Sequence, residues 1–159
     1  MRRITIYLFL LLSLCCMAQT AGLCFMSMPD QLCPYIDRHQ REYMLIMYGT
    51  TGKCVENPFG GVSCITDNTL NHLRIELTDS ISYDILLEND STWLLISTAC
   101  APVCSSVIKR YNGSWTNGVL VKMPIDAPFV KAEVVEGQVV YSNQTPLLRD
   151  DEENHNNVD

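Results

Sequence analysis

The chain has 159 residues, of which 47% are hydrophobic and 18% are charged. This length suffices for one domain of ordinary size, and the hydrophobic fraction argues against a disordered chain. Eleven Lys and Arg stand against 18 Asp and Glu, which gives a formal net charge of −7. This balance excludes a nucleic-acid-binding protein that acts through a basic surface.

The first 18 residues have the pattern of a secretory signal peptide. Arg2 and Arg3 precede an apolar run at residues 4–14, which is too short to anchor the chain across a bilayer. Cleavage is expected after Ala18, and Gly22 is the alternative site. The chain is therefore expected to be exported to the periplasm, to the outer-membrane surface or out of the cell, and no transmembrane segment is predicted.

Cys15 and Cys16 close the apolar run and raise the question of a lipid anchor. A lipid-modified cysteine normally follows a small residue, whereas Cys15 follows Leu14. Lipidation at either cysteine is therefore disfavoured but left open.

The rest of the chain is predicted to form a single domain at residues 19–149 and an acidic tail at residues 150–159. The tail is rich in Asp, Glu and Asn, a composition typical of disorder.

Two short helices are predicted at the start of the domain. Ser27 is expected to cap the first, with Pro29 in its first turn. Asp37 and Gln40 have the spacing of a capping box that opens a second helix at residues 38–48, which Gly49 ends. The helical spacing of the apolar residues predicts a core-facing side made of Ile36, Tyr43, Met44 and Met47. The residues predicted to face water are Arg38, Arg41 and Glu42.

Alternating hydrophobicity after residue 62 predicts strands. Leu73, Ile75 and Leu77 are expected on a buried face. His72, Arg74 and Glu76 are expected on the opposite, solvated face. Tyr83, Ile85 and Leu87 repeat the pattern, and residues 93–98 are apolar enough for a central strand covered on both sides.

Further strands are predicted at residues 106–111, 119–123, 129–135 and 138–141. Asn112-Gly113 and Glu136-Gly137 are candidate hairpin turns. Short strands joined by turns predict an antiparallel meander. The fold class is therefore α+β, with N-terminal helices packed on a meander sheet.

Six cysteines follow the signal peptide, an even number that suits disulfides in an exported protein. The sequence-local pairing is one of 15 connectivities. It joins Cys24 to Cys33, Cys54 to Cys64 and Cys100 to Cys104. The spacings match neither a zinc site nor a Cys-x-x-Cys redox motif, so no metal and no cofactor are predicted.

Several short motifs in fixed order resemble a known family. They are Met28-Pro29-Asp30 with Pro34-Tyr35, Val55-Glu56-Asn57 with Gly60-Gly61, Leu86-Leu87 with Asp90-Ser91-Thr92, and Ala101-Pro102-Val103 with Tyr111 and Trp115. Their order and spacing are similar to those of a Bacteroidales family of exported proteins of unknown function, over residues 25–115. The resemblance implies the envelope of a Gram-negative anaerobe and supplies no catalytic residue.

Asp79-Ser80-Ile81 and Asp90-Ser91-Thr92 resemble the acceptor pattern for O-glycosylation in that phylum. Ser80 and Ser91 are therefore candidate modification sites.

No catalytic constellation stands out. His39 and His72 are expected to be solvated, and so are Asp84 and Glu88. Nucleophile-elbow, P-loop, dinucleotide and EF-hand patterns are missing from the sequence. Tyr111 and Trp115 are instead the candidate binding surface, with Trp115 partly exposed.

Three functional hypotheses follow. The first is a non-enzymatic envelope module that binds another envelope protein or a glycan through a sheet face or edge. The second is a small enzyme of unrecognised type, with hydrolysis among the candidate reactions, that uses the sheet face and the loop at residues 124–128. The third is a secreted, disulfide-stapled inhibitor or host-facing binder. Partner and oligomeric state stay open.

Overall fold

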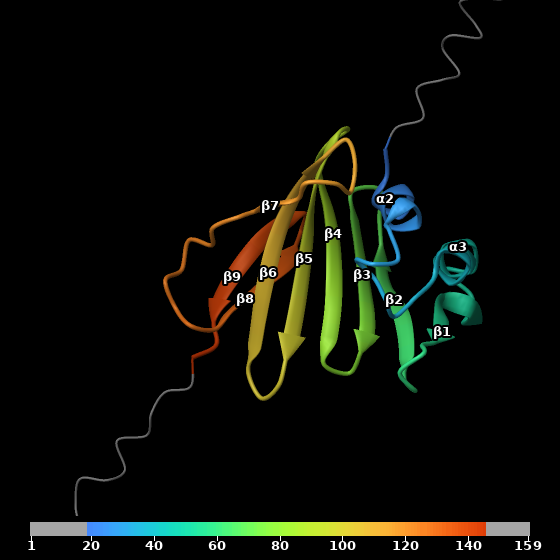
Figure 1. The fold of residues 1–159 in the computed structure, drawn as a ribbon, viewed down its shortest axis with the longest axis horizontal. Helices are drawn as coiled ribbons and strands as arrows, with labels where there is room; N and C mark the ends of the chain where they lie inside the picture. The colour runs from blue at the N-terminus through green and yellow to red at the C-terminus, as the bar shows by residue number, and fades with distance from the viewer. Residues whose placement is uncertain (1–18, 146–159) are drawn as a thin grey trace, which may run out of the picture.

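The computed structural model describes residues 19–145 (Figure 1). The predicted signal peptide, Cys15 and Cys16, and the predicted acidic tail lie outside these residues. The helical elements are α2 (Ala21–Ser27), α3 (Arg38–Ile46) and the short 3-10 helix η1 (Thr51–Lys53). The strands are β1 (Cys54–Glu56), β2 (Val62–Asn68), β3 (His72–Thr78), β4 (Ile81–Asn89), β5 (Thr92–Cys100), β6 (Cys104–Asn112), β7 (Val119–Leu120), β8 (Val130–Val135) and β9 (Gln138–Asn143).

Strands β1 to β7 form one antiparallel sheet in which every strand pairs with the next in the chain. This is the predicted meander, except that the last two predicted strands are not part of it. Strands β8 and β9 form a separate two-stranded sheet (Figure 1). The architecture is thus a mostly antiparallel sheet with two short helices.

The two faces of the large sheet are covered by different layers. On one face, alternate residues of β3 join α2 and α3 in a single core that includes Phe25, Met44, Leu73 and Ile75. On the other face, Ile96 and Ile108 pack against the β8–β9 hairpin, which contacts β4, β5 and β6. The predicted double coverage of the central strand β5 is therefore confirmed.

The hairpin is fastened to the sheet by hydroxyl groups as well as by apolar contacts. The Ala132 N–H of β8 donates to Ser106 Oγ at 2.9 Å, and Ser106 Oγ lies 2.7 Å from Thr98 Oγ1. Both side chains are buried. These buried polar atoms thus satisfy one another and fix the hairpin against β5 and β6.

The first helix does not lie where the sequence predicts it: α2 ends at Ser27, the residue at which the predicted helix begins, and Pro29 lies outside any helix. Thr20, not Ser27, is the N-cap, and its hydroxyl accepts from the Leu23 N–H at 3.1 Å. Ser27 closes the helix instead, because its hydroxyl donates to the Cys24 carbonyl at 3.0 Å. The prediction at Ser27 is wrong because a proline that suits the first turn of a helix is also common just after a helix ends, and Pro29 follows the C-cap residue Met28.

The second helix begins as predicted. Asp37 Oδ1 accepts from the Gln40 N–H at 2.8 Å, and Gln40 Oε1 accepts from the Asp37 N–H at 3.0 Å. The helix ends at Ile46, two residues before the predicted end, and Gly49 follows with a φ of +88°.

Two residues of α3 lie on the face opposite to the predicted one. Tyr43 is half-exposed, whereas Arg41 is only 1% exposed. The guanidinium group of Arg41 donates to the carbonyls of Ile36 and Met28, each at 2.6 Å, and to Asp30 Oδ1 at 2.9 Å. Arg41 therefore supplies hydrogen-bond donors to backbone carbonyls of the irregular segment between the helices, which are not paired in a helix or a sheet.

Removing the Arg41 guanidinium group should leave two carbonyls without donors. We expect Arg41→Met to lower the free energy of unfolding by about 2–4 kcal/mol, measured by urea denaturation. The matched substitution Arg38→Met, on the exposed side of the same helix, should change it by less than about 0.5 kcal/mol. Equal effects of the two substitutions would contradict the anchoring role of Arg41.

Two of the three expected cysteine pairs are present. Cys54–Cys64 and Cys100–Cys104 join directly opposed residues of adjacent strands. Cys24 and Cys33 are free and buried, so the expected Cys24–Cys33 pair is wrong. Cys24 is a residue of α2 whose side chain belongs to the core, and its Sγ accepts a hydrogen bond from the Gln19 side-chain amide. Burial raises the pKa of both thiols, that of Cys33 to about 11.

The later strands deviate in length. Glu136 and Gly137, with φ of 51° and 75°, form the predicted turn between β8 and β9. Asn112-Gly113 does not form a tight hairpin, since β6 pairs with β7 only after a longer loop, at Arg110 and Val119. Strand β7 has two residues where five were predicted.

Candidate functional site

The predicted binding surface at Tyr111 and Trp115 is not on the surface. Tyr111 is 3% exposed and Trp115 is 9% exposed, and both belong to the core shared with the helices. The Trp115 ring packs on Trp93 and Tyr111, with centroids 5.3 and 4.9 Å apart, and its Nε1 donates to the Cys24 carbonyl at 3.0 Å. Trp115 is predicted to be exposed because its sequence neighbours are polar. In the structure its indole is buried and joins the β6–β7 loop to α2.

The candidate modification sites lie in turns of the meander. Ser80 is exposed in the β3–β4 turn, and Ser91 is exposed in the β4–β5 turn. Both hydroxyl groups are thus accessible, and glycosylation of Ser80 and Ser91 stays a prediction.

Motif residues singled out in the sequence organise turns and linkers. The Met28 carbonyl and the Asp30 carboxylate are the acceptors of Arg41. Asn57 is buried and donates to the Leu77 carbonyl at 3.0 Å, while its Oδ1 accepts from the N–H groups of Phe59 and Gly61. These residues thus contribute to the fold rather than to a site.

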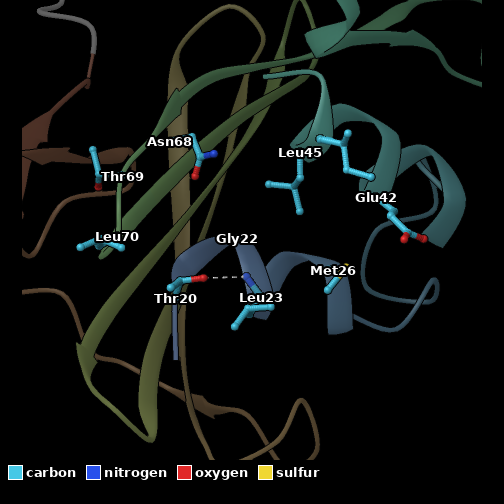
Figure 2. Close-up of a pocket in the computed structure, with 10 residues that line it drawn as sticks. Thr20, Gly22, Leu23, Met26, Glu42, Leu45, Asn68, Thr69 and Leu70 are labelled. Atoms are coloured by element: carbon cyan, nitrogen blue, oxygen red, sulfur yellow. Dashed lines mark hydrogen bonds between the residues drawn. The ribbon is translucent and has the colours of Figure 1, made fainter. Parts of the chain in front are cut away.

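An apolar pocket lies where α2, α3 and the β2–β3 turn meet (Figure 2). Its volume is about 590 Å³, within the range of small-ligand sites. Five large apolar side chains line it together with a polar rim. The apolar residues are Leu23, Met26, Leu45, Ile46 and Leu70, and the rim includes Thr20, Glu42, Asn68 and Thr69.

The walls of the apolar pocket are held by backbone contacts. The Ala21 N–H at the start of α2 donates to the Leu70 carbonyl at 3.0 Å, which fixes the β2–β3 turn against the helix. A Cβ atom on Gly22 would come 3.3 Å from Leu45 Cδ2, so glycine allows α2 and α3 to approach closely here. The pocket therefore belongs to the rigid packing of three elements.

The rim of the apolar pocket also carries two apolar side chains that are largely exposed. Leu70 is 74% exposed and Ile46 is 73% exposed, the two highest values among the exposed large apolar side chains of residues 19–145. Exposed apolar side chains that converge on one cavity mark an interaction site more strongly than scattered ones do. No binding residue of this pocket is predicted from the sequence. The local signal that could have indicated one is Leu70, a leucine within a polar turn.

A second, polar cavity of about 600 Å³ lies on the other side of the same turn. It is lined by the β2–β3 turn, by Asp67 and His72 of β2 and β3, and by Val134, Glu136 and Gly137 at the tip of the β8–β9 hairpin. Thr69 and Leu70 line both cavities.

His72 and Asp84, predicted to face water, are both buried beside this polar cavity. His72 Nδ1 lies 2.8 Å from Asp67 Oδ2, and its Nε2 lies 2.8 Å from Asp84 Oδ1. Arg74 Nη1 donates to Asp84 Oδ2 at 3.1 Å. The strand alternation placed His72 on the correct side of the sheet. It gave no sign that the hairpin 60 residues later in the chain covers that side (residues 130–143).

The imidazole of His72 is fully engaged by these carboxylates. Because each ring nitrogen faces a carboxylate, the doubly protonated form satisfies both contacts, and no ring nitrogen is directed into the polar cavity. Burial lowers the pKa of His72, but the hydrogen bonds and charges of Asp84 and Asp67 outweigh it, and the net pKa is raised above 6.5. The arrangement is that of a buried ionic clamp joining β2, β3 and β4.

This clamp should make stability depend on pH. The folded-state pKa of His72 is raised, so its contribution is fully present below about pH 6.5 and is lost as the pH rises through the folded-state pKa. We expect urea denaturation to give a lower free energy of unfolding at about pH 9 than at about pH 6. In His72→Gln this difference should shrink, whereas the exposed control His39→Gln should keep it. An unchanged pH dependence in His72→Gln would disprove the clamp.

Among residues 19–145, no group of three or more His, Cys, Asp or Glu side chains could hold a metal ion. Within the same residues, no helix is both long and apolar enough to cross a membrane.

The fold defines the chain as an antiparallel-sheet protein whose sheet carries two helices on one face and a hairpin on the other. The model of the family described as "Protein of unknown function (DUF3256)" matches residues 13–145, so the chain belongs to this family. The expectation of a family of unknown function is thereby confirmed. No curated protein matches the sequence.

One solved structure is similar to the chain, described as the structure of a domain of an uncharacterized protein from Porphyromonas gingivalis W83. The match has 18% sequence identity and a TM-score of 0.48, and it covers 64% of this chain and 52% of that one. The chain thus spans about half the length of that solved domain.

Proposed function

We propose that this protein is an exported, non-enzymatic binding module of a Gram-negative envelope and that the apolar pocket is its binding site. The observation that carries the proposal is the convergence of Leu70 and Ile46, both largely exposed, on one apolar cavity. An exposed apolar surface of this kind is stabilised when a partner removes it from water.

Export is supported by two disulfides and by the signal-peptide pattern. The alternative cleavage site after Gly22 lies inside α2, whose Ala21 is buried in the core. Cleavage after Ala18 leaves the whole helix and its N-cap Thr20 intact, which favours this site.

The enzymatic alternative has less support. The polar cavity brings Asp67, His72 and Glu136 together, as a hydrolytic site would require. However, both nitrogens of His72 already face carboxylates, so the imidazole has no nitrogen left to exchange a proton with a substrate. The inhibitor alternative rested on three disulfides, and only two pairs are present in the described part of the chain.

Export can be tested by the intact mass of the protein isolated from its native host. We expect a chain that begins at Gln19. Alkylation after denaturation should label two thiols, those of Cys24 and Cys33, because the other four mature cysteines are bridged. A mass that still includes residues 1–18 would contradict export, whereas a lipid-bearing chain that begins at Cys15 or Cys16 would change only the cleavage site. The absence of any free thiol would contradict the cysteine pairing.

Binding can be tested with the neutral apolar dye Nile red and the purified chain from Gln19 onward. We expect fluorescence to report a site that Leu70→Asp weakens by at least about tenfold, because a large apolar contact is lost. Val119→Asp is the matched control, since Val119 is 67% exposed on β7 and lies outside the pocket. Equal dye binding by both variants would remove the pocket as the site, and urea curves check that each variant folds.

A further inference from the structure

Resting on this proposed function, we infer that the apolar pocket takes a cationic peptide segment: large apolar side chains that enter the pocket, flanked by Lys or Arg. The inference concerns the chemistry of the partner and follows from three features of the pocket.

The first feature is the depth of apolar contact. Leu23 and Met26 of α2 and Leu45 of α3 are partly buried and line the pocket together with Leu70 of the β2–β3 turn (Figure 2). Ile46, which is largely exposed, also lines it. A partner that contacts both inner and rim residues must present more than one apolar side chain. An apolar segment of a peptide does so at alternate or helical positions.

The second feature is the charge of the rim. Glu42 is the one charged residue that lines the pocket, and it forms no ion pair within the described residues. Residues 19–145 contain 13 Asp and Glu against 8 Lys and Arg, so this part of the chain is acidic as well. A fatty-acid carboxylate or a lipid phosphate at this rim would meet a carboxylate and no cation. A Lys or Arg side chain would instead find a partner in Glu42, and the field of the acidic protein would attract it.

The third feature is the hydrogen-bonding capacity of the rim. Asn68 lines the pocket, and its side-chain amide forms no hydrogen bond with any other group of residues 19–145. A primary amide offers two donors and one acceptor, which is the complement of a peptide group. Together with Glu42, Asn68 therefore suits a cationic peptide better than an acyl chain, which has no polar groups along its length.

The test uses two blocked hexapeptides that share their apolar residues, Ac-KLLWLK-NH2 and Ac-ELLWLE-NH2, titrated calorimetrically into the disulfide-bonded chain from Gln19 onward. We expect the Lys peptide to bind about tenfold more tightly than the Glu peptide, and the ratio to fall as salt is added. Glu42→Gln should lower the ratio by about threefold, the size of one exposed ion pair. Glu76→Gln, an exposed carboxylate outside the pocket, should leave the ratio unchanged.

The outcomes separate this inference from the proposed function. If Nile red binds in a Leu70-dependent way but the Glu peptide binds as tightly as the Lys peptide, the cationic partner is excluded while the binding site remains. If neither the dye nor a peptide binds the wild-type chain, the proposed function itself fails. If phosphatidylcholine vesicles bind the chain through Leu70 and the peptides do not, the occupant is a lipid surface and the inference is overturned.

Discussion

A sheet with two apolar faces must be covered on both, and this constraint governs the rest of the molecule. Alternate residues of β4 and β5 are buried on opposite sides of the sheet, so neither face of these strands is left to water. Two helices of seven and nine residues cover one side, and a single hairpin covers the other. Helix α2 contacts β3 and β4, helix α3 contacts β1 and β2, and the recess where the two helices meet the β2–β3 turn is the apolar pocket.

The same constraint explains which parts of the fold could be predicted from the sequence and which could not. Alternation correctly placed Leu73, Ile75 and Leu77 on one buried face, and the capping box at Asp37 correctly located the start of α3. Such local signals depend on residues a few positions apart. The faces of His72 and Asp84 were assigned correctly but their exposure was not. Exposure depends on what a distant segment covers, and no local pattern contains that information.

The predicted exposure of Arg41 and Trp115 is wrong for a related reason. Each is a residue whose type and neighbours suggest a surface position, and each is buried because its polar atoms find backbone carbonyls in another element. The apolar pocket was equally beyond reach, since its walls come from three elements that meet only in the folded chain. Sequence-local pairing succeeded for the two cysteine pairs that face each other across adjacent strands. It failed for Cys24 and Cys33, which lie outside the sheet.

The order of strands has a consequence for assembly. Every strand from β1 to β7 pairs with its sequence neighbour. The large sheet can therefore grow one hairpin at a time, starting from the N-terminal strands. Each disulfide closes between neighbouring strands and can form as soon as its own hairpin exists. Topologies with such local pairing require little loop closure before contacts form. The β8–β9 hairpin comes last. Until it docks, Ile96 and Ile108 on the second face remain uncovered, and its docking is the step that seals that face.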